Sequence, residues 1–141
     1  MFFSEQDQLY KIPDPVEKNR RQGENGRNLM VVLYDDGPEA RSFIEKVLSA
    51  AQVDLQRDTA FFTLPPGEPM ALQAALKSVN AETVLLFGPS ADQLGLGINT
   101  RLYAPFEWQS RRWLFAEAPA LLEPDRTRKG LLWKALQQMF L

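Results

Sequence analysis

Two continuous apolar runs, residues 29–34 and 83–88, constrain the fold of this chain more than any other feature. A third apolar segment, residues 60–64, lies between them. A strand that is apolar at every position, instead of at alternate positions, is typical of a sheet that is covered on both faces. The sequence therefore predicts three strands, of which the strand at residues 29–34 is central.

Helical periodicity fills both gaps between these strands. Phe43, Ile44, Val47, Leu48 and Ala51 recur at helical spacing in the first gap, and a similar pattern predicts a helix over about residues 69–79 in the second. Strands that alternate with helices through short connections are typical of a parallel sheet with right-handed crossovers. The fold class expected is α/β, as a single three-layer domain whose mainly parallel sheet is flanked by helices.

The last part of the chain predicts one more helix that docks on the core. Its large apolar residues fall at i, i+1, i+4, i+7 and i+8, which forms one stripe of an α-helix. Before it, residues 98–103 and 111–116 predict either two further strands or a loop followed by one strand. The stripe consists of Leu132, Trp133, Leu136, Met139 and Phe140.

Residues 1–28 differ in composition from the rest of the chain. Two short apolar islands precede a polar run at residues 17–26, and such a run buries too little surface to order itself. We expect a flexible N-terminal segment that tethers a docking motif to a domain of residues 29–141. An equally open alternative is that the second island folds back as an edge strand. The candidate partner-binding residues are Phe2, Phe3, Leu9, Tyr10 and Ile12.

The chain contains neither cysteine nor histidine. Disulfides, thiolate zinc sites and cysteine nucleophiles are therefore excluded, as are histidine bases and histidine metal ligands. The formal charge of −2 and the pI of about 5.2 argue against binding nucleic acid through bulk positive charge. We expect no cofactor and no metal. Without a basic leader or a long apolar span, the sequence predicts a soluble, cytoplasmic protein.

Few residues suggest catalysis. Asp35 and Asp36 follow the first strand, where parallel sheets place functional groups, but one of them capping the next helix explains the pair more simply. A small hydrolase that uses this pair with a metal lacks a second cluster of ligands. Ser90 has no histidine or nearby lysine to activate it, so we expect it to cap a helix. Gly88, Gly95 and Gly97 match no phosphate-binding motif.

One region interleaves cations with aromatic rings. Such a mixture stacks bases and holds phosphates, although aromatic patches on an acidic domain more often bind protein. Trp113 and Phe115 share one strand face and are expected in the core, which leaves three other rings for an exposed aromatic patch. The candidate patch for nucleic acid or a partner consists of Arg101, Tyr103, Phe106, Trp108, Arg111 and Arg112.

Residues 29–141 resemble the psi subunit of the bacterial DNA polymerase III holoenzyme, a small clamp-loader accessory protein. The Leu-Trp pair in the last helix is the most specific element of this resemblance. The resemblance rests on three blocks in order: residues 29–33, followed by Asp35 or Asp36 and a helix with residues 43–50; residues 58–64; and residues 118–122, followed by the helix that contains residues 131–136.

The resemblance implies a reduced uracil-DNA glycosylase fold without the glycosylase active site. Asp35 or Asp36 matches the first catalytic position of that superfamily, but its histidine motif is impossible here. What the psi family implies is a non-enzymatic scaffold that contacts clamp-loader subunits through its N-terminal peptide and a chi-like subunit through its α/β body. The alternative is a catalytically inactive glycosylase-like domain that binds single-stranded or damaged DNA through the arginines and aromatic rings.

Overall fold

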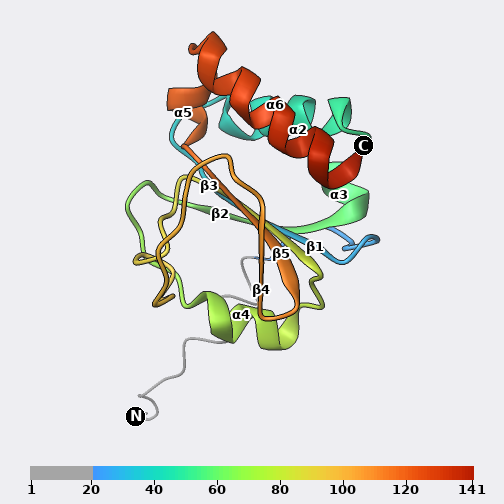
Figure 1. The fold of residues 1–141 in the computed structure, drawn as a ribbon, viewed down its shortest axis with the longest axis vertical. Coiled ribbons are helices and arrows are strands. Elements are labelled where there is room, and N and C mark those ends of the chain that lie inside the picture. The colour runs from blue at the N-terminus through green and yellow to red at the C-terminus, as the bar shows by residue number, and fades with distance from the viewer. Residues whose placement is uncertain (1–20) are drawn as a thin grey trace, which may run out of the picture.

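A computed structural model describes residues 21–141 and shows one five-stranded sheet with the strand order β2-β1-β3-β5-β4. The first four strands in this order run parallel, and β4 pairs antiparallel with β5 at one edge. The expected α/β class and mainly parallel sheet are therefore confirmed (Figure 1). The strands are β1 (Leu29–Tyr34), β2 (Thr59–Leu64), β3 (Thr83–Phe87), β4 (Phe106–Trp108) and β5 (Arg111–Ala116).

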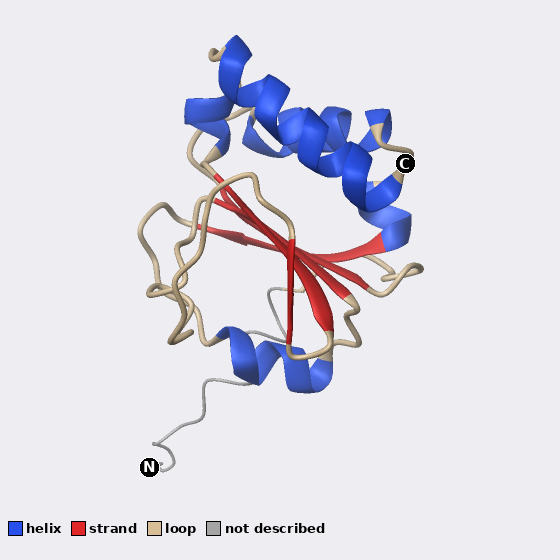
Figure 2. Cartoon of the chain, in the orientation of Figure 1, coloured by secondary structure: helices blue, strands red, loops and turns tan. Residues whose placement is uncertain are grey.

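Helices lie on both faces of the sheet (Figure 2). One face is covered by α2, α3, α5 and α6, whereas α4 and the loop after β3 cover the other. Each face has its own apolar core, so the sheet is the middle of three layers. The helices are α2 (Ala40–Ala50), α3 (Leu55–Asp58), α4 (Leu72–Ser78), α5 (Pro119–Leu122) and α6 (Arg126–Phe140).

Both faces of β1 are buried, which explains why the first apolar run has no polar face. Leu29, Val31 and Leu33 point into the core beneath α2 and α6, and Met30 and Val32 point into the core on the α4 side. All five are at most 1% exposed. Because β1 pairs with β2 on one side and β3 on the other, the predicted central position of this strand is confirmed.

The β4–β5 hairpin was not predicted. Residues 98–103 contribute only an isolated bridge from Leu102 to Phe115, and the edge strand forms instead at Phe106–Trp108. The hairpin turn places Gln109 and Ser110 at φ 54° and 61°. Two successive residues with positive φ are typical of a type I′ turn, for which Asn-Gly is the usual signal. A Gln-Ser turn carries no such signal, so the sequence pattern did not indicate the hairpin.

Residues 21–28, which the sequence pattern assigned to the N-terminal segment, pack along β2 and α3. Gln22 and Phe61 exchange two backbone hydrogen bonds of 2.9 Å each. Gly23 has φ +89°, and a Cβ there would lie 2.1 Å from the carbonyl oxygen of Thr59. Glycine is therefore required for this close approach. The candidate docking residues Phe2, Phe3, Leu9, Tyr10 and Ile12 lie outside the described residues.

The expected C-terminal helix is confirmed as α6. Asp125 caps it by accepting a hydrogen bond from the backbone N–H of Arg128 at 3.0 Å. Leu132, Leu136 and Met139 are buried, and the remaining two stripe residues, Trp133 and Phe140, pack partly buried against the same core. Within residues 21–141, no helix is long and apolar enough to cross a membrane.

Replacing Leu136 with alanine should lower the free energy of unfolding by about 2–5 kcal/mol, because it leaves a cavity beneath α6. Leu131→Ala on the same helix is the matched control, since Leu131 is 46% exposed whereas Leu136 is 0% exposed. This control should cost less than about 0.5 kcal/mol. Urea unfolding followed by tryptophan fluorescence measures both changes. Equal losses would contradict the docking of α6 through this stripe.

Candidate functional site

The carboxyl ends of β1, β3 and β5 surround a recess of about 460 Å³. The chain leaves β1 through α2 on one face to reach β2, and then through α4 on the other face to reach β3. In parallel α/β sheets, ligands bind in the crevice where the connections diverge in this way. We call this feature the strand-end recess. It is lined by Tyr34, Gly88, Pro89, Ser90, Thr100, Leu102, Phe115, Ala116, Glu117, Ala118 and Leu121.

Tyr34, the last residue of β1, forms one wall of the strand-end recess. Gly88 has φ +121°, and a Cβ there would lie 2.4 Å from Cδ2 of the Tyr34 ring, so only glycine lets the ring lie where it does. The Tyr34 hydroxyl donates a hydrogen bond of 2.7 Å to Oε1 of Gln93. Burial raises the pKa of Tyr34. This hydroxyl is therefore neutral and already paired.

Ser90 does not cap a helix as expected. Its backbone N–H donates to Oε1 of Gln93 at 3.0 Å, and its Oγ accepts from the backbone N–H of Gln93 at 3.3 Å. Residues 91–95 form turns instead of a helix. The serine thus closes a turn at the mouth of the strand-end recess.

Glu117 brings a carboxylate to the opposite wall. It accepts a hydrogen bond of 2.8 Å from the Tyr103 hydroxyl, and it forms an ion pair with Nε of Arg128 at 2.9 Å. Burial raises the pKa of Tyr103, and the hydrogen bond to Glu117 raises it further. The tyrosine is therefore neutral, and Glu117 is paired with Arg128 of α6, which also forms an ion pair of 3.2 Å with Asp125.

The rim of the strand-end recess is apolar. Leu102 is 52% exposed and Leu121 is 50% exposed, and both line the recess. The Tyr34 hydroxyl and the Glu117 carboxylate are already paired with groups behind the walls, and the surface left for a ligand is mainly hydrocarbon. Apolar side chains that remain exposed around a concave site are typical of a surface that binds another apolar group.

Asp36 caps α5 and not the helix that follows it in the sequence. Its carboxylate oxygens accept from the backbone N–H of Ala120 at 3.1 and 3.2 Å. The residue before α2 is Glu39, and its side chain makes no capping hydrogen bond. The expectation that Asp35 or Asp36 caps the following helix is therefore wrong. Among residues 21–141, no group of three or more acidic side chains is placed to hold a metal.

The arginine and aromatic residues of the candidate patch are divided among several places. Phe106 and Trp108 pack on the α4 face, with ring centroids 6.4 Å and 5.3 Å from that of Trp113. Tyr103 packs into the core on the opposite face. Trp113 and Phe115 are 0% and 2% exposed, which confirms that they belong to the core. Phe106 and Trp108 are half-buried rather than freely exposed.

The arginines of the candidate patch also diverge. Nε of Arg111 donates to the Ala81 carbonyl at 2.9 Å, and Nη1 of Arg112 donates to the Met139 carbonyl at 2.9 Å. Arg101 is exposed on the loop before β4. Phe106 and Arg112 line a small recess of about 180 Å³, and Trp108 pairs with Arg111 across the β4–β5 hairpin. The structure therefore does not gather these six residues on one surface.

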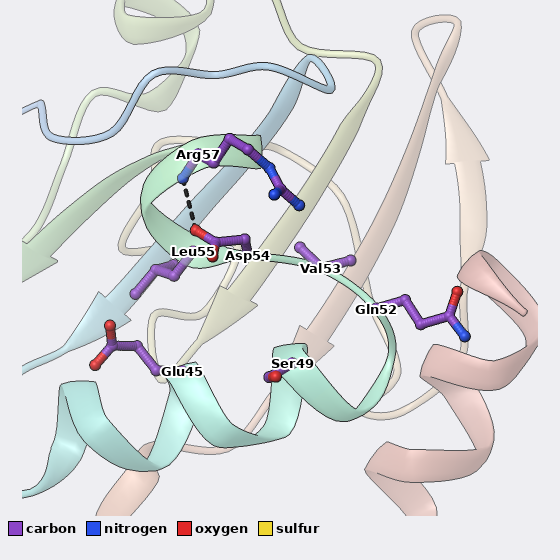
Figure 3. A pocket seen from close by; sticks show the side chains of 7 residues that line it. All are labelled: Glu45, Ser49, Gln52, Val53, Asp54, Leu55 and Arg57. Atoms are coloured by element: carbon purple, nitrogen blue, oxygen red, sulfur yellow. Dashed lines mark hydrogen bonds between the residues drawn. The ribbon is translucent and has the colours of Figure 1, made fainter.

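A second recess, of about 490 Å³, lies between α2 and α3 and has polar walls (Figure 3). Asp54 caps α3 by accepting from the backbone N–H of Arg57 at 2.8 Å. Sequence reasoning missed this recess, although an aspartate followed by a short helical turn signals a cap. It is lined by Glu45, Ser49, Gln52, Val53, Asp54, Leu55 and Arg57.

Asp58, next to this polar recess, is a buried carboxylate that is only 5% exposed. Its Oδ2 accepts from the backbone N–H of Asp54 at 2.8 Å, and its Oδ1 accepts from Nε of Arg57 at 3.0 Å. The hydrogen bond from Arg57 holds the pKa of Asp58 below its usual value, against the opposing effect of burial. These bonds fix the turn of α3, so the polar recess has a structural explanation.

In comparisons with known proteins, no family model and no curated protein matches this chain.

Replacing Asp36 with alanine should remove the cap of α5 and lower the free energy of unfolding by about 1 kcal/mol. Asp35→Ala is the control, because Asp35 is exposed and its carboxylate makes no hydrogen bond among the described residues. The control should change the free energy by less than about 0.5 kcal/mol. Chemical unfolding at neutral pH compares the two variants, and an equal effect would show that the α5 contact contributes nothing.

Asp58 should make the stability of the domain depend on pH in the acid range. Because its folded-state pKa is lowered, its contribution is present above the unfolded pKa of about 4 and is lost as the pH falls through the lower folded value. Asp58→Asn should therefore flatten the loss of stability that begins as the pH falls below about 5 and continues into the acid range. The exposed Asp92→Asn is the control and should keep the wild-type slope. Urea unfolding across this pH range measures the slopes.

Proposed function

We propose that this protein is a non-enzymatic accessory subunit of a bacterial replicative clamp loader, similar to psi, and that it acts by binding other proteins. The observation that carries the proposal is the strand-end recess, with its apolar rim of Leu102 and Leu121. The resemblance of residues 29–141 to psi supplies the identity of the partners. In this proposal the recess contacts a chi-like subunit, and the N-terminal peptide contacts the clamp loader.

The strand-end recess leaves mainly apolar surface open to a partner. The hydroxyls of Tyr34 and Tyr103 are paired, and the Glu117 carboxylate forms an ion pair with Arg128, which it shares with Asp125. Covering apolar surface with a partner stabilises the complex by about 25 cal/mol for each Å² that is removed from water. A protruding apolar side chain of another protein is therefore a better occupant than a charged substrate. Interface energy concentrates in a few such buried anchors.

Binding to nucleic acid has less support. A site for single-stranded DNA needs aromatic platforms next to cations along one groove. Here Phe106 and Trp108 pack on one face of the sheet, Tyr103 packs on the other, and Arg111 is bonded to the Ala81 carbonyl. DNA binding by an inactive glycosylase-like domain is therefore the alternative that the experiments distinguish from protein binding.

Replacing Leu102 and Leu121 together with glutamate should weaken binding to the purified chi-like subunit of the same organism by about 30-fold or more, which corresponds to about 2 kcal/mol. The matched control is Leu131→Glu, at a leucine that is 46% exposed but lies outside the recess. Isothermal titration calorimetry measures affinity, and circular dichroism checks that each variant is folded. Equal affinity of the double variant and the control would remove the recess from the interface.

Tyr10→Ala combined with Ile12→Ala tests the N-terminal peptide in the full-length protein. The combined variant should lose binding to the purified clamp loader but keep binding to the chi-like subunit, because the two contacts use different parts of the chain. Apolar docking is only weakly sensitive to salt, whereas phosphate contacts weaken steeply as salt rises. Binding to labelled single-stranded DNA that disappears at high salt, without any clamp-loader binding, would favour the nucleic-acid alternative.

A further inference from the structure

The helices α2 and α6 run side by side in the helical layer and leave an open groove of about 300 Å³ between them (Figure 1). We call it the helix groove. It is separate from the strand-end recess, with which it shares no residue. Its lining residues are Phe43, Lys46, Val47, Ala50, Lys129, Leu132 and Trp133.

The floor and walls of the helix groove are apolar. Phe43 and Leu132 are 8% and 1% exposed, and they join the core beneath. Val47 and Trp133 are only partly buried, so each keeps an apolar surface open to the groove. Ala50 is small and exposed, which leaves the groove unfilled at that end of α2. A half-buried tryptophan beside unfilled apolar space suits an inserted apolar side chain.

Two cations frame this apolar space. Lys46 lies on α2 and Lys129 lies on α6, and both are exposed. Neither ammonium group has a carboxylate partner among residues 21–141, whereas Arg57 and Arg128 are each held in ion pairs. The nearby carboxylate of Glu45 lines the polar recess instead (Figure 3). The helix groove is thus a positive, apolar site on a chain whose formal charge is −2.

We infer that the helix groove binds an acidic-apolar peptide of a partner protein, in which a large apolar side chain stands next to carboxylates. The apolar side chain enters between Val47 and Trp133, and the carboxylates meet Lys46 and Lys129. The volume of the helix groove lies near the lower end of the range for ligand pockets, which is about 300–1,000 Å³. The groove therefore admits one or two anchoring side chains. This inference concerns a second surface and does not rest on the proposed clamp-loader role.

Charge complementarity makes the inference specific. An acidic peptide is repelled by the net charge of the chain as a whole, so its binding depends on the local field of these two lysines. Reversing both lysines converts attraction into repulsion without touching the apolar floor. Because both side chains are exposed, the change leaves the core intact. Loss of binding can therefore be separated from loss of folding.

The test uses full-length protein and a fluorescein-labelled synthetic peptide that carries three aspartates followed by leucine and phenylalanine. Fluorescence anisotropy measures its affinity for the wild type, for Lys46→Glu combined with Lys129→Glu, and for Lys134→Glu. Lys134 is an exposed lysine of α6 outside the helix groove, so its reversal is the matched control. We expect the double reversal to weaken binding by about tenfold or more and the control by less than about threefold.

A second measurement locates the peptide. The indole N–H signal of Trp133, assigned from Trp133→Phe, should shift on addition of peptide, whereas that of the fully buried Trp113 should not. A peptide with asparagines in place of the aspartates should bind about tenfold more weakly or worse. Equal affinity of the two lysine variants, equal affinity of the two peptides, or an unmoved Trp133 signal would each overturn the inference. A Trp133 signal that moves on dilution without peptide would assign the groove to a second copy of this chain instead.

Discussion

The burial of β1 on both of its faces is the constraint on which the rest of the structure depends. Leu29 and Val31 on one face, and Met30 and Val32 on the other, are at most 1% exposed. A strand of this kind is stable only when helices cover both faces, so the chain must cross to opposite sides of the sheet through α2 and α4. That divergence opens the crevice at the carboxyl ends of the strands. The strand-end recess is therefore a consequence of how the core is covered.

Several polar side chains of this domain form hydrogen bonds that hold the backbone in place. Asp36 and Asp54 cap short helices, and Asp58 fixes the turn between α3 and β2. Arg111 and Arg112 each donate to a main-chain carbonyl. Among residues 21–141, the strand-end recess and the helix groove are apolar concavities that stay open, and two lysines without an ion-pair partner in this part of the chain frame the second. In our proposals, both concavities bind other proteins.

Sequence reasoning succeeded where the physical signal is local. Continuous apolar runs predicted β1 and β3, and the spacing of Leu132, Leu136 and Met139 predicted the docked helix α6. It failed where a contact joins distant parts of the chain. Asp36 and Ala120 are 84 residues apart, so no pattern around Asp36 indicates that its carboxylate caps α5. Likewise, the rings expected on one exposed patch are divided because β4 turns back on β5 and directs Phe106 and Trp108 onto Trp113.

The sequence by itself determined the class of the fold, the central strand and the amphipathic faces of α2 and α6, because hydrophobic periodicity is a property of neighbouring residues. It also determined that histidine and cysteine chemistry is absent. Only the tertiary structure decided which surfaces stay open. The strand-end recess joins Tyr34, Gly88 and Leu121, and the helix groove joins Lys46 with Lys129. Residues so far apart in the chain come together only when the sheet and its helices pack.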